Sequence, residues 1–340
     1  MTATTAFREG MRRTNGAPVL LAGMCILTLL LALPLALALR AMLEAHLGSS
    51  LVAEQVASRA DYQWWQEFLF QAAGLGTTFV PSIIGFGAVL RNLDALLDNR
   101  EMATTIAGVT TGWLLIWSFL SGGVIDRLAR SRRTRAHHFF AAAGVHFWRF
   151  LRLGIVALLV YSFLFGWVHP WLFDDLFGRL TGDLTVERTA LLIRLAGYVI
   201  FGAVLIFFNV VFDYARFRIV VEDRRSAIGA IAASWGFFRR HFARVIALYL
   251  LNGAAFAVLA AAYGLLSPGA PGAGVTMWIV LLLGQAYIVG RHYLKLVFYA
   301  SQTSLLQSAL AHADYTAAPA IEWPDSPAAE SIANANPIGP

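Results

Sequence analysis

Long runs of apolar residues dominate this chain, and each is close to the length that crosses a bilayer. They cover about 18–39, 103–125, 153–172, 189–212, 245–266 and 275–300. Crossing the hydrocarbon core takes about 20 residues of helix. Inside the bilayer a backbone group finds no water, so each run must satisfy its own hydrogen bonds as a helix. The sequence predicts an all-α fold: a polytopic helical membrane bundle with about six transmembrane helices.

The composition supports a membrane solvent and argues against a soluble domain. Hydrophobic residues make up 58% of the chain and charged residues only 14%, whereas soluble proteins carry roughly 25% charged residues. The net charge of +6 is compatible with a nucleic-acid partner. The arginines, however, lie between apolar runs and do not line one soluble face, so we expect no nucleic acid. They instead suit the flanks of membrane helices.

No motif in the chain carries recognisable chemistry. The single cysteine, Cys25, excludes a disulfide within one chain and a cysteine-based metal site. We find no HExxH pattern, no phosphate-binding glycine loop and no nucleophile elbow. We therefore expect no catalytic residue, no metal and no cofactor. We favour a non-enzymatic protein and leave enzymatic activity open.

The distribution of arginine predicts the orientation. Basic residues collect on the cytoplasmic side of membrane proteins, which places the arginine-rich stretches 127–152 and 216–244 in the cytoplasm. This requires that the uncharged, glycine-rich stretch 68–90 does not cross. We thus predict a cytoplasmic N-terminal segment 1–17, a membrane domain 18–312 with an outer membrane-associated segment 40–102, and a cytoplasmic C-terminus. The first run also follows Arg12 and Arg13 as in a signal peptide, but it is longer than the usual 7–15 residues.

The C-terminal tail and an internal similarity complete the organisation. Residues 313–340 contain five prolines among Ala, Ser and Asn, which predicts a disordered cytoplasmic tail. Residues 142–149 resemble residues 232–239 at a spacing of 90, and both stretches follow a span and a basic loop. Either the unit of span, basic loop, amphipathic elbow and span is duplicated, or the match is chance among common residues.

The second of these elbows has the pattern of a helix lying in the membrane interface. Ser226 is placed to cap it, and Ile228, Ile231, Trp235, Phe238 and Phe242 recur at helical spacing. We expect the residues that anchor the protein at the interface to be aromatic or cationic on both sides of the membrane. These predicted anchors are Trp64, Trp65, Arg224, Arg225, Trp235, Arg239 and Arg240.

A family resemblance rests on this same stretch. The residues Val220-Val221-Glu222-Asp223-Arg224-Arg225-Ser226, then Ala230-Ile231, then Ser234-Trp235-Gly236-Phe237-Phe238-Arg239 directly follow a span. The pattern resembles uncharacterised bacterial multi-pass membrane proteins and is weakly similar to the membrane-anchor domain of some glycerophosphoryl diester phosphodiesterases. It covers roughly 189–300 and implies anchor-like helices, because no phosphodiesterase barrel is present. We accordingly expect a bacterial cytoplasmic (inner) membrane location.

A candidate intramembrane polar site lies at the inner end of the spans. Asp213 ends the fourth span, and Asn209 precedes it by one turn. Arg291 and Lys295 lie four residues apart on the last helix and so share a face. Asp213 either pairs with Arg291 or joins a polar pocket for an anionic headgroup. Alternatively, each charged side chain reaches the interface separately.

The functional expectation follows from these features. We expect an integral inner-membrane protein that acts through lipid contact or as a scaffold for a membrane protein partner. Its partners are the lipid bilayer and its anionic phospholipid headgroups. A transporter or permease for an amphiphilic or anionic solute is the first alternative, and a membrane enzyme acting on lipid is the second.

Overall fold

The computed structural model describes residues 1–48, 50–58, 61–79, 93–100, 104–131, 134–266 and 274–310. Every element in these ranges is a helix, so the all-α prediction is confirmed. Within them, six helices are long and apolar enough to cross a membrane. They are α2 (Pro18–Leu47), α6 (Thr104–Arg130), α7 (Ala136–Phe163) with its continuation to Thr181, α9 (Glu187–Val221), α10 (Ala227–Leu266) and α11 (Val275–Ala309). The predicted tail 313–340 lies outside the described residues.

The helices are longer than the apolar runs that predicted them. For example, α2 continues to Leu47 past the predicted end at residue 39, and α9 continues to Val221 past residue 212. An apolar run marks only the part of a helix that lies in hydrocarbon. The remaining turns lie beyond that part, where polar residues are tolerated.

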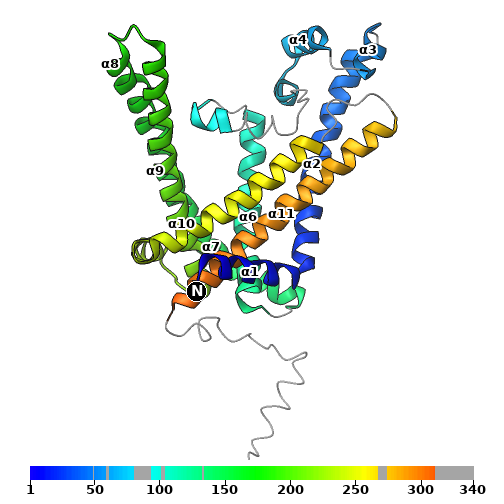
Figure 1. Ribbon diagram of the computed structural model, residues 1–340. Helices are drawn as coiled ribbons and strands as arrows, with labels where there is room; N and C mark the ends of the chain where they lie inside the picture. Colours follow the sequence, from blue (N-terminus) through cyan, green and yellow to red (C-terminus); the bar gives the residue numbers. More distant parts are fainter. Residues whose placement is uncertain are drawn as a thin grey trace, which may run out of the picture.

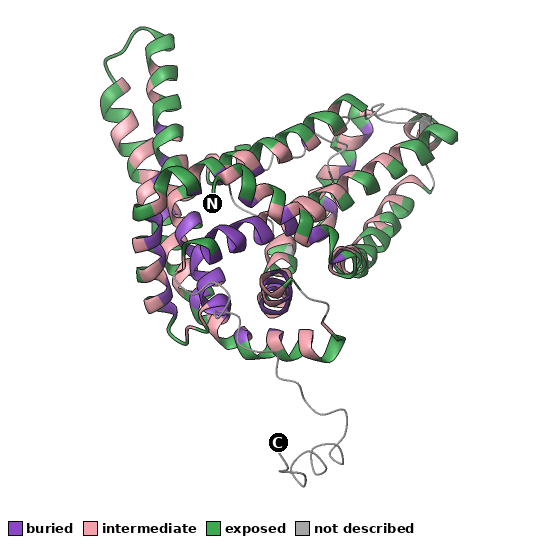
Figure 2. Cartoon of the chain, turned by 60° about the horizontal axis from the view of Figure 1, so that its bottom comes forward, coloured by how far each residue is buried: buried purple, intermediate pink, exposed green. Residues whose placement is uncertain are grey.

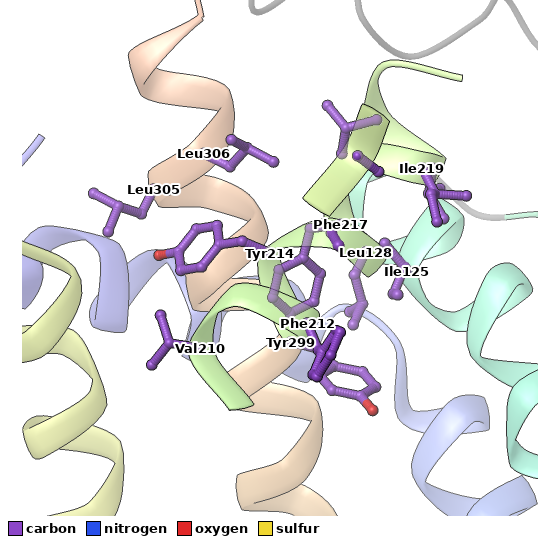
Figure 3. Close-up of a cluster of buried hydrophobic side chains, with 14 of the residues drawn as sticks. Ile125, Leu128, Val210, Phe212, Tyr214, Phe217, Ile219, Tyr299, Leu305 and Leu306 are labelled. Atoms are coloured by element: carbon purple, nitrogen blue, oxygen red, sulfur yellow. The ribbon is translucent and has the colours of Figure 1, made fainter. Parts of the chain in front are cut away.

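The core of the molecule lies at one end of the bundle, where α6, α9 and α11 converge with the short helix α1 (Ala3–Asn15) (Figure 1). Ile125 and Leu128 of α6 meet Tyr214 and Phe217 of α9 there, together with Leu305 of α11 (Figure 3). Buried residues gather at this end and exposed ones extend along the outer arms (Figure 2). The bundle is therefore tightly packed at one end and splayed at the other.

The convergent end also holds two buried hydrogen bonds between helices. The indole Nε1 of Trp117 on α6 donates to the hydroxyl of Tyr299 on α11 at 3.0 Å. The hydroxyl of Tyr214 on α9 donates to Oε1 of Gln302 on α11 at 2.5 Å. A buried polar group is costly unless it is bonded, so these pairs fix how α11 lies against its neighbours.

The N-terminal segment is a structural helix that packs on α11. Thr2 caps α1 by accepting a hydrogen bond from the backbone of Thr5. Gly10 lies so close to α11 that a Cβ there would stand 2.7 Å from Cβ of Ser301. Arg13 donates to Oε1 of Gln307 at 2.7 Å and to the carbonyl of Leu128 at 3.2 Å. The segment predicted only as cytoplasmic thus holds α6 and α11 together.

Close approach of glycines explains the pairing of α6 with α7. A Cβ at Gly122 would stand 2.9 Å from Cβ of His146, and one at Gly123 would stand 2.7 Å from the carbonyl of Phe139. Small residues of this kind let membrane helices pack backbone to backbone. The pair forms a hairpin around the basic loop that precedes Ala136.

The third span runs further than predicted. After α7 the chain continues through η2 (Leu164–Val168), η3 (Trp171–Leu176) and α8 (Phe177–Thr181), in which η2 and η3 are π-helical. Pro170 lies between them and has no N–H to give to the helix ladder. The wider π turns absorb this interruption, so the helix does not end at the predicted residue 172.

The segment 40–102, predicted to be outer, contains α3 (Ala53–Ser58), α4 (Tyr62–Gln71) and the 3₁₀ helix η1 (Gly74–Thr78). No continuous helix runs through residues 68–79, and residues 80–92 of the predicted non-crossing stretch lie outside the described ranges. Trp64 is buried against Phe68 and donates to Nδ1 of His46 at 3.1 Å. It therefore packs against its neighbours, and its role as an interfacial anchor stays a prediction. Trp65 donates to the carbonyl of Phe79 at 3.0 Å.

Candidate functional site

The first candidate site is the polar cluster around Asp213. This side chain is buried among α9, α10 and α11. The hydroxyl of Tyr249 on α10 donates to its Oδ2 at 2.9 Å, and Nη1 of Arg216 on α9 lies 3.6 Å from its Oδ1. A carboxylate retained in an apolar bundle is expected to have both a hydrogen bond and a counter-charge, and Asp213 has both.

The cations of this cluster differ from the predicted ones. Lys295 lies over the ring of Trp117, with its Nζ 3.7 Å from the ring centroid. Arg291, one turn earlier on α11, is exposed, and the ion pairs among the described residues do not join it to Asp213. Asn209 is exposed as well.

Two members of the cluster escaped the sequence reasoning. Arg216 lies three residues after Asp213, which is a spacing that brings side chains together on a helix. This spacing could have identified Arg216 from the sequence. Tyr249 is 36 residues away and comes to Asp213 only through the packing of α10 on α9. Among the described residues, no group of His, Cys, Asp and Glu side chains is arranged to hold a metal ion.

The second candidate site is built on the first part of α10, residues 227–240, which we call the elbow helix. Its N-terminus is capped as predicted, since Oγ of Ser226 accepts from the backbone of Gly229 at 3.1 Å. It ends at His241, whose φ of −122° and ψ of 24° are not helical. Nδ1 of His241 lies 3.2 Å from the carbonyl of Phe237. In a regular α-helix this carbonyl accepts from the backbone N–H of His241, so the side chain competes with the helix ladder. The elbow helix therefore turns away from the rest of α10 (Figure 1).

This break is not repeated in the first predicted elbow. Residues 139–150 belong to α7, which the structure gives as one helix into the span. Both copies begin after a basic loop that follows a long helix, but only the second has a residue that leaves the helical backbone. The duplication of the unit stays a prediction.

The elbow helix has three faces that follow from its periodicity of 100° per residue. Ala230, Ser234 and Phe237 are fully or almost fully buried and face the protein. Ile228 and Trp235 lie seven residues apart on a second face and are 73% and 42% exposed. The third face directly adjoins the apolar one and carries Ala232, Gly236, Arg239 and Arg240. The helix thus presents an apolar face and a cationic face to its surroundings.

The cationic face forms an open pocket of about 600 Å³, here called the arginine pocket. Its lining comes from the end of α9, the following loop and the elbow helix. The lining residues are Arg218, Arg224, Ala232, Ala233, Gly236, Arg239 and Arg240.

Arg218 is the deepest of these residues. It is only 5% exposed, and its guanidinium lies 5.5 Å from the ring centroid of Phe237. It is paired with Glu222, whose carboxylate also accepts from Arg224. Its Nε has no hydrogen-bond partner among the described residues. The pocket thus has a buried guanidinium at its base, and Glu222, which is not one of its lining residues, pairs with two of its arginines.

Three of the predicted anchors lie at the arginine pocket. Arg224, Arg239 and Arg240 line the arginine pocket, whereas Arg225 is exposed and does not. Trp235 borders the pocket, because the guanidinium of Arg239 lies 5.8 Å from its ring centroid. Sequence reasoning missed Arg218, which lies between two apolar residues in the last turn of α9 and has no distinguishing pattern.

Comparison with family models, with curated proteins and with solved structures found no match. The resemblance to bacterial membrane-anchor helices therefore stays a prediction. The fold itself defines the class: with its six long apolar helices, the chain is a multi-pass α-helical membrane protein.

Proposed function

We propose that this chain is a non-enzymatic protein of the bacterial inner membrane that acts through lipid contact, with its elbow helix lying in the cytoplasmic headgroup layer. The observation that carries the proposal is the three-faced elbow helix, which breaks from its span at His241. A helix whose apolar face is uncovered and whose other face is cationic is typical of helices that lie in a membrane interface.

The orientation is part of the proposal. The elbow helix follows the arginine-bearing end of α9, and the positive-inside rule favours the cytoplasm for such a loop. An even number of spans then brings both chain ends to that side, in line with the packing of α1 on the last part of α11. The inner leaflet offers anionic headgroups, to which each nearby arginine contributes about 1 kcal/mol of attraction.

Spin labels on single cysteines test this placement. In a Cys25→Ala background we would label Ile228→Cys on the apolar face, Phe242→Cys just beyond the break and Ala232→Cys on the cationic face, then reconstitute the full chain into liposomes. Labels at 228 and 242 should be more accessible to oxygen, which partitions into lipid, and the label at 232 to a water-soluble nickel complex. A membrane-impermeant maleimide should reach Ala232→Cys only from the cytoplasmic side. Equal water accessibility at all three positions, or labelling from outside, would overturn the proposal.

A further inference from the structure

The strongest unassigned feature is the arginine pocket, whose positive charge exceeds what the protein itself neutralises. Four guanidinium groups line it, and the carboxylate of Glu222 pairs with two of them, Arg218 and Arg224. Neither Arg239 nor Arg240 forms an ion pair with a described residue; Arg240 donates from Nε only to the carbonyl of Gly236 at 3.1 Å. The pocket is therefore suited to an anion.

The arginine pocket combines one buried guanidinium, that of Arg218, with the exposed guanidinium groups of Arg239 and Arg240. Arg218 is buried at its base, and its Nε lacks a partner among the described residues. That atom has almost no accessible surface, so Arg218 contributes its charge, and the exposed Arg239 and Arg240 contribute the donors. The planar guanidinium offers paired donors that match phosphate oxygens. The space in front of it is lined by Ala232, Ala233 and Gly236, which are small and uncharged.

We infer that the arginine pocket is a binding site for the phosphate group of an anionic phospholipid, an inference that rests on the proposed placement of the elbow helix. Phosphate is the chemistry that a lipid headgroup shares with a soluble phosphate. The apolar face favours the lipid: Trp235, in contact with Arg239, is 42% exposed and shares that face with Ile228, which is 73% exposed. A headgroup in the pocket leaves its acyl chains along this apolar face.

The test is a lipid titration of the purified full chain in mild detergent, read by native mass spectrometry. Phosphatidylglycerol and phosphatidylcholine with the same acyl chains are compared. We expect phosphatidylglycerol to saturate one site. The double variant R239Q/R240Q should lower the affinity for this lipid by about tenfold or more, because each lost contact is a charge-assisted hydrogen bond. The matched control R225Q/R244Q removes the same charge from exposed positions outside the pocket, and should change the affinity by less than about threefold.

A second variant separates a pocket from diffuse charge. Gly236→Leu fills the pocket and keeps every arginine, because a Cβ at Gly236 meets only the end of Arg240, at 3.9 Å. It should lower the affinity for phosphatidylglycerol as strongly as R239Q/R240Q does. The control Gly253→Leu lies on the same helix in open space and should have no effect.

The outcomes are decisive for the pocket. Equal losses of phosphatidylglycerol affinity in R239Q/R240Q and R225Q/R244Q, or an unchanged affinity in Gly236→Leu, would refute the proposed binding site. So would binding of phosphatidylcholine as tight as that of phosphatidylglycerol. Displacement of the lipid by inorganic phosphate at equal concentration would make a soluble phosphate the ligand and overturn the lipid assignment.

The spin labels separate this inference from the proposed function. If the label at Ile228→Cys reports lipid while the pocket variants behave like their controls, the inference fails and the proposed function stands. If that label reports water, the proposed function itself fails.

Discussion

Asp213 shows how charged side chains are stabilised within this bundle. Its carboxylate is neutralised by Arg216 on the same helix and held by Tyr249 from α10. Lys295 is held differently, by the faces of Trp117 and Trp113 at 3.7 and 5.8 Å from the ring centroids. Such cation–π contacts stabilise a cation where water is scarce. The buried charges therefore tie α6, α9, α10 and α11 together.

Removing the hydroxyl that serves Asp213 is expected to destabilise the protein. Tyr249→Phe leaves a buried carboxylate short of one donor, so thermal unfolding in detergent should report a loss of about 1.5–3 kcal/mol. Tyr287→Phe is the matched control, because the buried Tyr287 hydroxyl has no partner among the described residues. A loss in the control equal to that in Tyr249→Phe would contradict this account.

Glu9 makes the stability of α1 depend on pH. Its hydrogen bond with Arg12, together with that from Arg13, lowers its pKa below the ordinary value of 4.5. A lowered pKa in the folded state stabilises the protein above the unfolded value, and this stability is lost as pH falls through the folded value. Deuterium exchange at the backbone amides of α1, corrected for its intrinsic pH dependence, should therefore increase as pH falls below about 4.5. In Glu9→Gln the acid-dependent increase should vanish.

At the scale of the elements, contact between backbones decides which helices pair. Gly10 brings α1 onto α11, Gly122 and Gly123 bring α6 onto α7, and Gly290 lies against Leu259 where α10 meets α11. In lipid the hydrophobic effect does not drive helices together, so close packing at small residues has a larger share. These glycines are the positions at which a helix pair is most sensitive to substitution.

Gly10→Ala should release α1. Its Cβ would stand 2.7 Å from Cβ of Ser301 and 2.9 Å from the carbonyl of Val297, so one of the two helices must move. We expect a cost of about 1–3 kcal/mol, typical of overpacking, measured as a lower midpoint of thermal unfolding. Gly16→Ala, whose Cβ would meet nothing closer than 3.5 Å, is the control. An unchanged midpoint in Gly10→Ala would show that α1 does not pack on α11 as described.

At the scale of the whole molecule, packing is concentrated at the end that carries the arginines. The core of Figure 3 lies there, and the outer halves of α7, α9 and α10 expose apolar side chains. An apolar exposed surface on a membrane helix is suited to lipid. The convergent end therefore holds the splayed helices together, and it adjoins both candidate sites.

Two phenylalanines test this division. Phe217 is fully buried at the convergent end, whereas Phe163 is 57% exposed on the outer arm. Phe217→Ala should cost about 3–5 kcal/mol and markedly reduce the recovery of folded protein. Phe163→Ala should change the free energy of unfolding by less than about 0.5 kcal/mol, as surface substitutions do. Comparable losses in the two variants, measured by thermal unfolding in the same detergent, would contradict a core confined to one end.

The sequence by itself determined the class of protein, the number of long apolar helices and the capped start of the elbow helix. These features depend on local composition: an apolar run of bilayer length forms a helix wherever it lies in the chain. Only the tertiary structure decided that Arg216 and Tyr249 serve Asp213, that Arg218 forms the base of the arginine pocket, that Trp64 is buried and that α1 packs on α11. Except for Arg216, which its spacing pointed to, these pairings join residues on different helices. They are set by how the helices cross, and a single-sequence pattern does not record crossing.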